Sequence, residues 1–449
     1  MNTENVDKVT DKKCLNQPQC QFFVVRKKRL CRMTVRPGRN YCGEHEPQPI
    51  TEKGKDDTRI PCPYDPKHTC YASKLLKHLA ICNARQSEAP SYIVQNVNAP
   101  PGTDAAPRTL LSQVPQEKIL ALIEKVNILY DKYVKDTITT VAEQPIHEAV
   151  MADFTEEGRA ESSLRQASSL LHIVEAEGLV QDGTCYVELG AGKGHLSYYA
   201  YRAWCGGRGG AGRGRVVLVD RASLRHKRDN KLRPARGGDG DIDEGDAPPA
   251  GGACRIRADL AHLALDKVPE VESCDAVVGL AKHLCGVATD YALRCLAGAR
   301  GARGAVLATC CHHRCEPAAY VGAPHLQEMG ITAEELGIML GVVSWATSGD
   351  GRPRPPRPAS KRLKREESTP DSTGGSVAAE RPVGAVGAAG AAGRAAAGRR
   401  CKLLLDHGRA LFLRRRGFGA RLVHYVPSHV SLENVAIVAS VASVDTNTT

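Results

Sequence analysis

The feature that most constrains the fold of this chain is a series of strands and helices that alternate from residue 184 to residue 440. The series opens with TCYVEL (184–189), a mostly apolar stretch of strand length, and a helical stretch follows at 195–204. Strands that alternate with helices predict an α/β fold with a mostly parallel sheet and helices on both faces. Further strands are predicted at 215–220, 274–280, 304–310, 421–426 and 434–440.

The last two predicted strands differ from the others in how they are connected. Only residues 427–433 separate them, too few for a crossover helix, so we expect them to pair antiparallel at one edge of the sheet. Before the first strand, apolar residues at helical spacing predict a helix over 116–135 and a second over 156–177. The sequence therefore predicts a Rossmann-like α/β domain over residues 113–445.

Three segments do not follow the alternating pattern. Residues 205–214 are rich in Gly and Arg, and residues 233–253 in Gly, Asp, Pro and Ala. Residues 349–400 run from a Pro/Arg stretch into a Gly/Ala tract. Such compositions bury too little apolar surface to offset the entropy lost on ordering. We therefore predict that all three are low-complexity inserts in the domain.

Composition argues against several classes of protein. No apolar run in the 449 residues approaches the roughly 18–20 residues of a membrane span, so no membrane association is expected. The polar start, MNTENVDKVTDKK, does not resemble a secretory signal. Without that route, the 17 cysteines favour metal binding over disulfides. The net charge of +11 favours an acidic partner, with nucleic acid first.

A first Cys/His group lies within residues 14–48 and has the spacing C-x10-C-x10-C-x2-H. Its members are Cys20, Cys31, Cys42 and His45. Three thiolates and one imidazole are a common tetrahedral set for structural zinc, and zinc can supply the folding energy of so short a segment. The spacing predicts a zinc finger, and the alternative is a solvated run of charges with incidental cysteines.

Basic side chains gather between the ligands of this group, with no acidic residue from Cys20 to Cys42. Phe22, Phe23 and Tyr41 interleave with them. This mixture is typical of a surface that binds a phosphate backbone. The predicted contacts to nucleic acid are Arg26, Lys27, Lys28, Arg29 and Arg32.

A second group, within residues 58–84, has the spacing C-x5-H-x9-H-x3-C. A helix over SKLLKHLAIC would place the last two members, four residues apart, on one face. We predict a second zinc finger here and a linker over 85–112; the alternative is two unrelated histidines and two buried cysteines. The predicted ligands are Cys62, His68, His78 and Cys82.

The turn after the first strand of the alternating series, VELGAGKGHL (187–196), carries Gly190, Gly192 and Gly194. Glycines there let the backbone turn tightly and approach a ligand. The spacing is G-x-G-x-G, with Glu188 two residues before the first glycine, whereas the dinucleotide fingerprint is G-x-G-x-x-G. This form is similar to the cofactor turn of S-adenosylmethionine-dependent methyltransferases.

Two aspartates complete the predicted cofactor site, together with Glu188 and the three glycines. Asp220 ends the next strand, where an acid can accept hydrogen bonds from ribose hydroxyls. Asp259 would follow a third strand and lie near the adenine, with a surface aspartate as an equal alternative.

The fourth and fifth predicted strands lead into AKHLCGVATD (281–290) and TCCHHRCE (309–316). Ligands of open α/β sheets bind outside the carboxyl ends of strands, so Lys282 and His283 are the predicted base or cation, with Asp290 as an orienting carboxylate. Adjacent cysteines in the second segment do not easily point at one tetrahedral centre. We therefore favour a loop that contacts substrate or cofactor over a third zinc site; buried core cysteines are the alternative.

These blocks resemble a known family, the eukaryotic tRNA 2'-O-ribose methyltransferases that act at position four of the acceptor stem. CQFFVVRKKRLCRM…YCGEH resembles their CCCH finger, and PCPYDPKHTC…LLKHLAIC their CHHC finger. The resemblance continues in VELGAGKGHLSYY, LVDR, KHLCGVATDYALRCL, CCHHRC and CKLLLDHGRALFLRRRGF…YVPSHVSLENVAIVAS. Apart from linkers and inserts, it covers most of residues 14–441.

The resemblance implies a class I methyltransferase domain, zinc in each finger, S-adenosylmethionine at the glycine turn and tRNA as substrate. Two other functions stay open: an RNA-binding protein with an inactive methyltransferase-like scaffold, and a methyltransferase for protein or small molecules. KRLKRE (361–366) resembles a nuclear import signal or is a charge run in a loop, so we expect a location in the nucleus, the cytoplasm or both.

Overall fold

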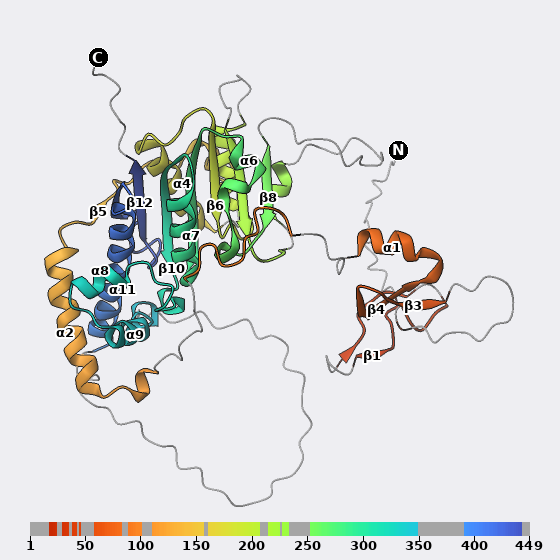
Figure 1. Ribbon diagram of the computed structural model, residues 1–449, viewed down its shortest axis with the longest axis horizontal. Coiled ribbons are helices and arrows are strands. Elements are labelled where there is room, and N and C mark those ends of the chain that lie inside the picture. The colour runs from red at the N-terminus through yellow and green to blue at the C-terminus, as the bar shows by residue number, and fades with distance from the viewer. Residues whose placement is uncertain are drawn as a thin grey trace, which may run out of the picture. The chain divides into compact units, whose positions relative to one another are not determined.

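The chain divides into two compact units, residues 1–89 and residues 90–449. The first unit holds the two small Cys/His modules, and the second holds the α/β domain (Figure 1). The computed structural model describes residues 18–24, 29–35, 38–42, 45, 58–82, 89–100, 110–156, 160–206, 214–224, 227–232, 252–348 and 390–441.

An eight-stranded sheet forms the middle of the second unit (Figure 1). Strands β6 to β10 pair in parallel, whereas β12 runs antiparallel to both of its neighbours. The predicted α/β fold is therefore confirmed, and so is the antiparallel pairing of the last two strands. The strand order is β5 (Thr139–Thr140), β11 (Phe418–His424), β12 (Val435–Val441), β10 (Ala302–Cys310), β9 (Ala276–Cys285), β6 (Thr184–Leu189), β7 (Arg215–Asp220) and β8 (Ala253–Arg257).

The edge of the sheet differs from the prediction. The two-residue strand β5 pairs with β11, so the hairpin of β11 and β12 lies one strand inside the edge. A pair of exposed threonines carries no apolar alternation, and for that reason the sequence pattern did not indicate a strand there.

Helices pack on both faces of the sheet, and the pleat divides the strand residues between them. Tyr186 of β6 belongs to the buried cluster that includes residues of α3, α4 and α5, whereas Cys185 and Val187 belong to the cluster that includes residues of α2, α7, α9 and α11. None of the described helices is long and apolar enough to span a membrane. The helices are α2 (Gln116–Tyr133), α3 (Glu148–Phe154), α4 (Glu161–Ala176), α5 (His195–Trp204), α6 (Pro269–Glu272), α7 (Val287–Gly298), α8 (Ala323–Glu328), α9 (Ala333–Val342), α10 (Trp345–Ser348) and α11 (Ala391–Arg414).

Two of the predicted inserts are shorter than expected. Helix α11 begins inside the segment predicted as an insert at 349–400, and β8 begins at the last residue of the one predicted at 233–253. Alanine has the highest helix propensity, and one side of α11 is buried, so the end of the Gly/Ala tract is helical. The inner parts of the three predicted inserts, 207–213, 233–251 and 349–389, lie outside the described residues.

Part of the predicted linker, 85–112, belongs to the α/β unit. Ile93 forms an isolated β-bridge with Leu263, and the buried Asn98 amide donates to the carbonyl oxygens of Leu260 (2.7 Å) and Leu263 (2.8 Å). These partners lie 162 and 165 residues after Asn98 in the sequence, so local composition does not reveal the contacts. Residues 83–88 and 101–109 lie outside the described residues.

Each Cys/His module of the first unit is built around a short antiparallel pair of strands. In the first, β1 (Phe23–Val24) pairs with β2 (Arg29–Leu30). In the second, β3 (Arg59–Cys62) pairs with β4 (Asp65–Tyr71), and α1 (Leu75–Ile81) follows. The buried core of the first module consists of three cysteines and one valine, so metal coordination would supply most of its folding energy.

Candidate functional site

The four predicted ligands of the first module converge on one point. Cys20 Sγ and Cys42 Sγ lie 3.5 and 3.4 Å from His45 Nδ1, and Cys31 Sγ lies 4.0 Å from Cys42 Sγ. Zinc bonds of about 2.3 Å to sulfur and about 2.0 Å to nitrogen place the corners of a tetrahedron about 3.5–3.8 Å apart. The four atoms therefore fit a structural zinc ion.

The second module brings its four ligands together in the same way. The two thiol sulfurs of Cys62 and Cys82 are 3.6 Å apart, and the Nε2 atoms of His68 and His78 are 3.2 Å apart. The sulfur-to-nitrogen distances are 3.2 and 3.4 Å. His78 lies in α1 and Cys82 caps its C-terminus, as the four-residue spacing predicts. These distances also fit tetrahedral zinc.

The basic segment of the first module lies only partly within the described residues. Arg29 and Arg32 are described, and the Arg32 side chain is exposed. Phe22 stacks on His45 with ring centroids 4.0 Å apart, and the neighbouring Phe23 is exposed. The described part therefore presents a guanidinium and an aromatic ring to solvent. Arg26, Lys27 and Lys28 lie outside the described residues.

The glycine turn has the geometry that its sequence predicts. Gly190, Gly192 and Gly194 all adopt positive φ, between 51° and 74°, a conformation that costs glycine nothing but strains other residues. The N–H groups of Gly190 and Ala191 donate to the carbonyl oxygen of Val219 at the end of β7. The turn therefore folds over the carboxyl ends of β6 and β7.

A buried ion pair that sequence reasoning missed holds this turn in place. Arg255 of β8 donates to both carboxylate oxygens of Asp229, at 2.9 and 2.8 Å, and its third nitrogen donates to the Gly192 carbonyl oxygen at 3.0 Å. Asp229 lies at the end of a segment with no apolar pattern. The pairing of β8 with β7 places Arg255 beside Leu218, and the folded chain brings the segment of Asp229 to it.

Glu188 of β6 stabilises the glycine turn through the first turn of α5, the helix that follows it. The pleat of β6 directs its side chain toward α5, where its carboxylate accepts hydrogen bonds from the backbone N–H (2.9 Å) and the hydroxyl of Ser197. Burial raises the pKa of Glu188 to about 7, although the Ser197 hydrogen bonds and the charge of Lys282 oppose the shift. Glu188 does not line the cavity described next, so its place in the site is indirect.

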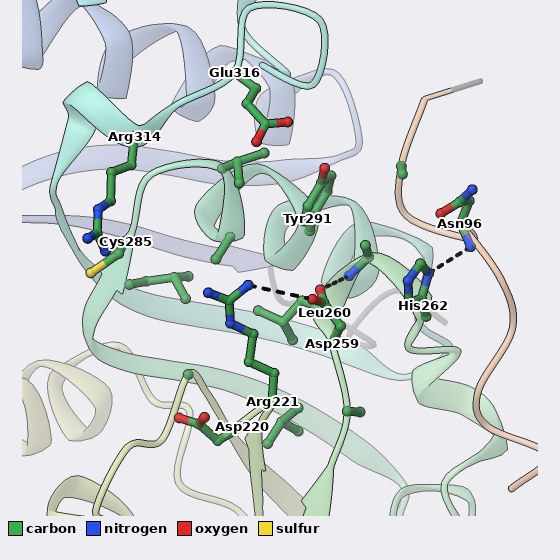
Figure 2. A pocket seen from close by; sticks show the side chains of 18 of the residues that line it. Asn96, Asp220, Arg221, Asp259, Leu260, His262, Cys285, Tyr291, Arg314 and Glu316 are labelled. Carbon is green, nitrogen blue, oxygen red and sulfur yellow. Dashed lines mark hydrogen bonds and ion pairs between the residues drawn. The ribbon is translucent and has the colours of Figure 1, made fainter. Parts of the chain in front are cut away.

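A cavity of about 750 Å³ lies at the carboxyl ends of the parallel strands (Figure 2). Its size is within the range of small-molecule sites. Four of the predicted site residues line it: Gly190, Asp220, Asp259 and His283. Arg314 and Glu316, from the predicted loop at 309–316, also line it. Sequence reasoning missed four other lining residues, which no local pattern singles out: Asn96, Arg221, His262 and Tyr291.

The two aspartates of the cavity are held by backbone N–H groups. Asp220 accepts hydrogen bonds from Gly192 and Ala222, both at 2.7 Å. Asp259 accepts one from Ala261 at 3.0 Å, and its other oxygen lies 3.9 Å from the Arg221 guanidinium (Figure 2). Each carboxylate oxygen has two lone pairs, so both aspartates keep the capacity to accept hydrogen bonds from ligand hydroxyls.

Lys282 and His283 have different surroundings although they are adjacent at the end of β9. Lys282 points away from the cavity and donates to the Ser163 hydroxyl at 2.5 Å, and burial lowers its pKa. His283 lines the cavity, and its pKa is lowered by partial burial and then by the charge of Lys282. A neutral imidazole that faces the cavity can accept a proton.

Asp290 lies in a buried network and not beside Lys282 or His283. Its carboxylate accepts hydrogen bonds from Arg409 Nη2 (2.7 Å), Arg409 Nε (3.1 Å) and the Val321 N–H (3.2 Å). Arg409 also donates to Asp406, which accepts from His312 at 2.8 Å. The predicted orienting carboxylate therefore joins α7 to α11 and supports the site from outside.

The segment TCCHHRCE divides between this network and the cavity wall. His312 and Cys315 are buried beside Asp406 and Asp290, whereas Arg314 and Glu316 line the cavity. Cys310 and Cys311 form a separate group with Cys285. The prediction of a loop near the ligand fits Arg314 and Glu316, and the alternative of core cysteines fits Cys315.

Three family models match this chain, one for each Cys/His module and one for the α/β domain. The family model "Methyltransferase TRM13" matches residues 165–440, "CCCH zinc finger in TRM13 protein" matches 18–46, and "U11-48K-like CHHC zinc finger" matches 59–83.

Curated proteins match along almost the whole chain. Those from Mus musculus and Homo sapiens, each named "tRNA:m(4)X modification enzyme TRM13 homolog", are 31% identical to it, over 94% of this chain and 94% of their own. The Saccharomyces cerevisiae protein "tRNA:m(4)X modification enzyme TRM13" is 25% identical, over 93% of this chain and 95% of its own. No solved structure matches the chain.

Proposed function

Because the chain belongs to the TRM13 methyltransferase family, we propose that it methylates tRNA with S-adenosylmethionine as the methyl donor. The methyl acceptor in this proposal is the ribose 2'-hydroxyl of the nucleotide at position four of the acceptor stem. The relatives are named as tRNA modification enzymes, and that name supports the substrate class. The observation that carries the proposal is the glycine turn, which borders a cavity lined by two aspartates and a histidine.

The size of the cavity and its hydrogen-bond acceptors support the proposed methyl donor. At Gly190 a side chain would meet Leu284 Cδ1 at 3.1 Å, so the absence of one keeps the turn close to the cavity. Asp220 and Asp259 supply carboxylates that would accept hydrogen bonds from ribose hydroxyls and from an amino group. Bound there, S-adenosylmethionine would supply an activated methyl group, so most of the catalysis would be positioning.

The chain's own contribution to the chemistry is the removal of one proton. A ribose hydroxyl is a weak acid, and its proton must leave as its oxygen takes the methyl group. We assign His283 as the group that accepts this proton, because it lines the cavity and its lowered pKa keeps the imidazole neutral. Lys282 lies behind it, and its charge favours the neutral form of His283.

RNA recognition in this proposal is shared between the two units. A-form RNA exposes its 2'-hydroxyls in a wide, shallow minor groove, which proteins read largely by shape. The exposed Arg32 and Phe23 of the first module supply charge and a stacking surface for such a stem. Zinc would hold that module rigid enough to present them.

The test is a methylation reaction with labelled S-adenosylmethionine and unmodified tRNA transcripts, followed by nucleoside analysis. We expect a labelled 2'-O-methyl nucleoside that maps to position four. The matched control is the same tRNA with a 2'-deoxynucleotide at that position, which should take no label. A labelled base would contradict the proposed acceptor, and no label with intact cofactor binding would favour the inactive scaffold.

Single substitutions test the proton acceptor. His283→Ala should lower turnover by about 10²- to 10⁴-fold and leave the affinity for S-adenosylmethionine near normal. Lys282→Ala should also lower turnover, because Lys282 sets the electrostatic environment of His283. Calorimetric binding of S-adenosylmethionine separates a catalytic loss from a loss of folding. Retained turnover in either variant would remove that residue from the mechanism.

A location in the nucleus or the cytoplasm stays a prediction. The basic run at 361–366 lies outside the described residues. Replacing its basic residues by alanine in a fluorescently tagged chain should shift the protein toward the cytoplasm, and an unchanged distribution would exclude an import role.

A further inference from the structure

We propose that Cys285, Cys310 and Cys311 form a third metal site, a zinc centre of three thiolates at the wall of the cofactor cavity. The three sulfur atoms lie within 4.8 Å of one another, and in the described part of the chain no further Cys, His, Asp or Glu joins the group. Zinc sites with three protein ligands keep a fourth position for water or a substrate oxygen. We infer that an oxygen of this kind completes the site.

The sheet brings the first two thiols together. Cys285 ends β9 and Cys310 ends β10, and the two residues are register partners in this parallel pair. Paired residues of neighbouring strands project from the same face. Their sulfur atoms are therefore only 3.1 Å apart. The Gly286 N–H also donates to the Cys310 carbonyl oxygen at 3.1 Å, which fixes the ends of the two strands to each other.

An unusual backbone conformation brings in the third thiol. In an extended strand the residue after Cys310 would point to the opposite face. Cys311 instead adopts the left-handed region, with φ 48° and ψ 41°. Among the described residues other than glycine, positive φ occurs only here and at Asn96. Such strained conformations cluster at functional sites. The expectation that adjacent cysteines do not easily point at one centre holds for extended backbone, which Cys311 does not have.

The arrangement favours a metal over a disulfide. A disulfide would join only two of the three sulfurs, and it would not account for the left-handed backbone conformation of Cys311. Thiolates are soft ligands that select zinc, and tetrahedral zinc separates two sulfurs by about 3.8 Å. The observed 3.1 Å needs only a small rotation of side chains to reach that separation. The two finger modules of the same chain show ligand separations of 3.2 to 4.0 Å.

The surroundings supply a counter-charge and access to the cavity. Zinc with three thiolates carries one net negative charge. The Arg314 guanidinium lies next to Cys285, and both residues line the cavity (Figure 2). Gly286 allows this approach, because a Cβ there would lie 2.4 Å from Arg314 Cβ. Because the three thiolates already outweigh the charge of the zinc ion, the ligand we expect at the fourth position is a neutral oxygen donor.

The test is the zinc content of the full-length protein, prepared under reducing conditions with added zinc and measured by mass spectrometry of the metal. We expect about three zinc ions per chain, two in the fingers and one at this site. Cys311→Ser should lower the content by about one ion without loss of the folded α/β unit, since Cys311 follows the strand. Cys285→Ser should do the same, and Cys254→Ser is the matched control that should keep all three.

Cobalt gives a second readout that does not depend on activity. The full chain loaded with Co²⁺ should show thiolate-to-metal absorbance that falls in Cys311→Ser and persists in Cys254→Ser. A wild-type content of about two zinc ions per chain would overturn the proposal. So would a peptide map in which Cys285 and Cys310 are joined by a disulfide in the reduced, zinc-supplied protein.

Discussion

Replacing Gly194 by alanine should destabilise the α/β unit much more than the same change at Gly192, in the same turn. Both glycines have left-handed φ, +74° and +51°. A Cβ at Gly192 would meet no atom within 4 Å. A Cβ at Gly194 would lie 2.7 Å from Leu218 Cδ2 and 2.8 Å from both Arg255 Nη2 and Asp229 Oδ1. The two variants therefore separate the cost of backbone conformation from the cost of packing.

The structure sets the expected size of each effect. The left-handed conformation costs an L-residue about 1–2 kcal/mol, and Gly192→Ala should show that cost alone. Gly194→Ala adds overpacking of about 1–3 kcal/mol, because its neighbours belong to a buried ion pair and a buried leucine that cannot easily move. The expected losses in free energy of unfolding are therefore about 1–2 kcal/mol at Gly192 and about 2–5 kcal/mol at Gly194.

Tryptophan fluorescence in urea measures this difference in the right part of the chain. The two tryptophans are Trp204, at the end of the helix that follows the turn, and Trp345, in α10. Both lie in the second unit, so the finger modules do not contribute to the signal. Equal destabilisation by the two variants would refute the claim that the Arg255–Asp229 pair confines the turn.

Three further predictions concern the buried Arg409 network, the Glu188 carboxyl group and the basic segment of the first module. Arg409→Met should destabilise the α/β unit by about 3–5 kcal/mol in urea, because it leaves Asp290 and Asp406 buried without their cation. The control is Arg415→Ala, which should have a much smaller effect because its pair with Glu328 is exposed. The pKa of Glu188 is about 7 in the folded chain and 4.5 in the unfolded chain, so the folded chain binds this proton more tightly. The contribution of Glu188 to the free energy of unfolding is therefore largest below pH 4.5 and declines by up to about 3 kcal/mol toward pH 7. Unfolding measured across this pH range should show a flatter profile for Glu188→Gln, and an identical profile would contradict the assigned pKa. Joint replacement of Lys27, Lys28 and Arg29 by alanine should reduce the slope of log K against log salt for tRNA binding by up to about 3. The control Lys132→Ala, in the other unit, should leave the slope unchanged. An unchanged slope in the triple variant would count against the finger as an RNA contact.

Local sequence patterns predicted the helices and strands well where each element is either buried on both faces or amphipathic. The ranges 184–189, 195–204 and 215–220 are β6, α5 and β7 as predicted, because strands covered on both faces are continuously apolar and the intervening helix is amphipathic. The patterns failed where composition was ambiguous. The Gly/Ala tract that begins α11 reads as low complexity, yet packing against the core makes it a helix.

The residues of the candidate site also divide into those that local sequence patterns identify and those that they do not. Gly190, Asp220, Asp259 and His283 lie at or just after the carboxyl ends of strands, so the parallel sheet brings them to one edge and the sequence could identify them. Asp290 comes shortly after a strand, but it lies in the first turn of α7, where its side chain is buried and pairs with Arg409. Asn96 and Arg255 had no local signal at all.

The sequence by itself determined the class of fold, the two sets of four metal ligands and the glycine turn. Each of these depends on spacing along the chain: the period of strands and helices, the separation of ligands, and the positions where positive φ is needed. Only the tertiary structure decided which charges are buried together and which thiols meet. The Arg255–Asp229 pair spans 26 residues, Arg409–Asp290 spans 119, and Cys285–Cys310 spans 25. Contacts of this kind arise when strands pair in register and helices pack over them, and no local pattern encodes them.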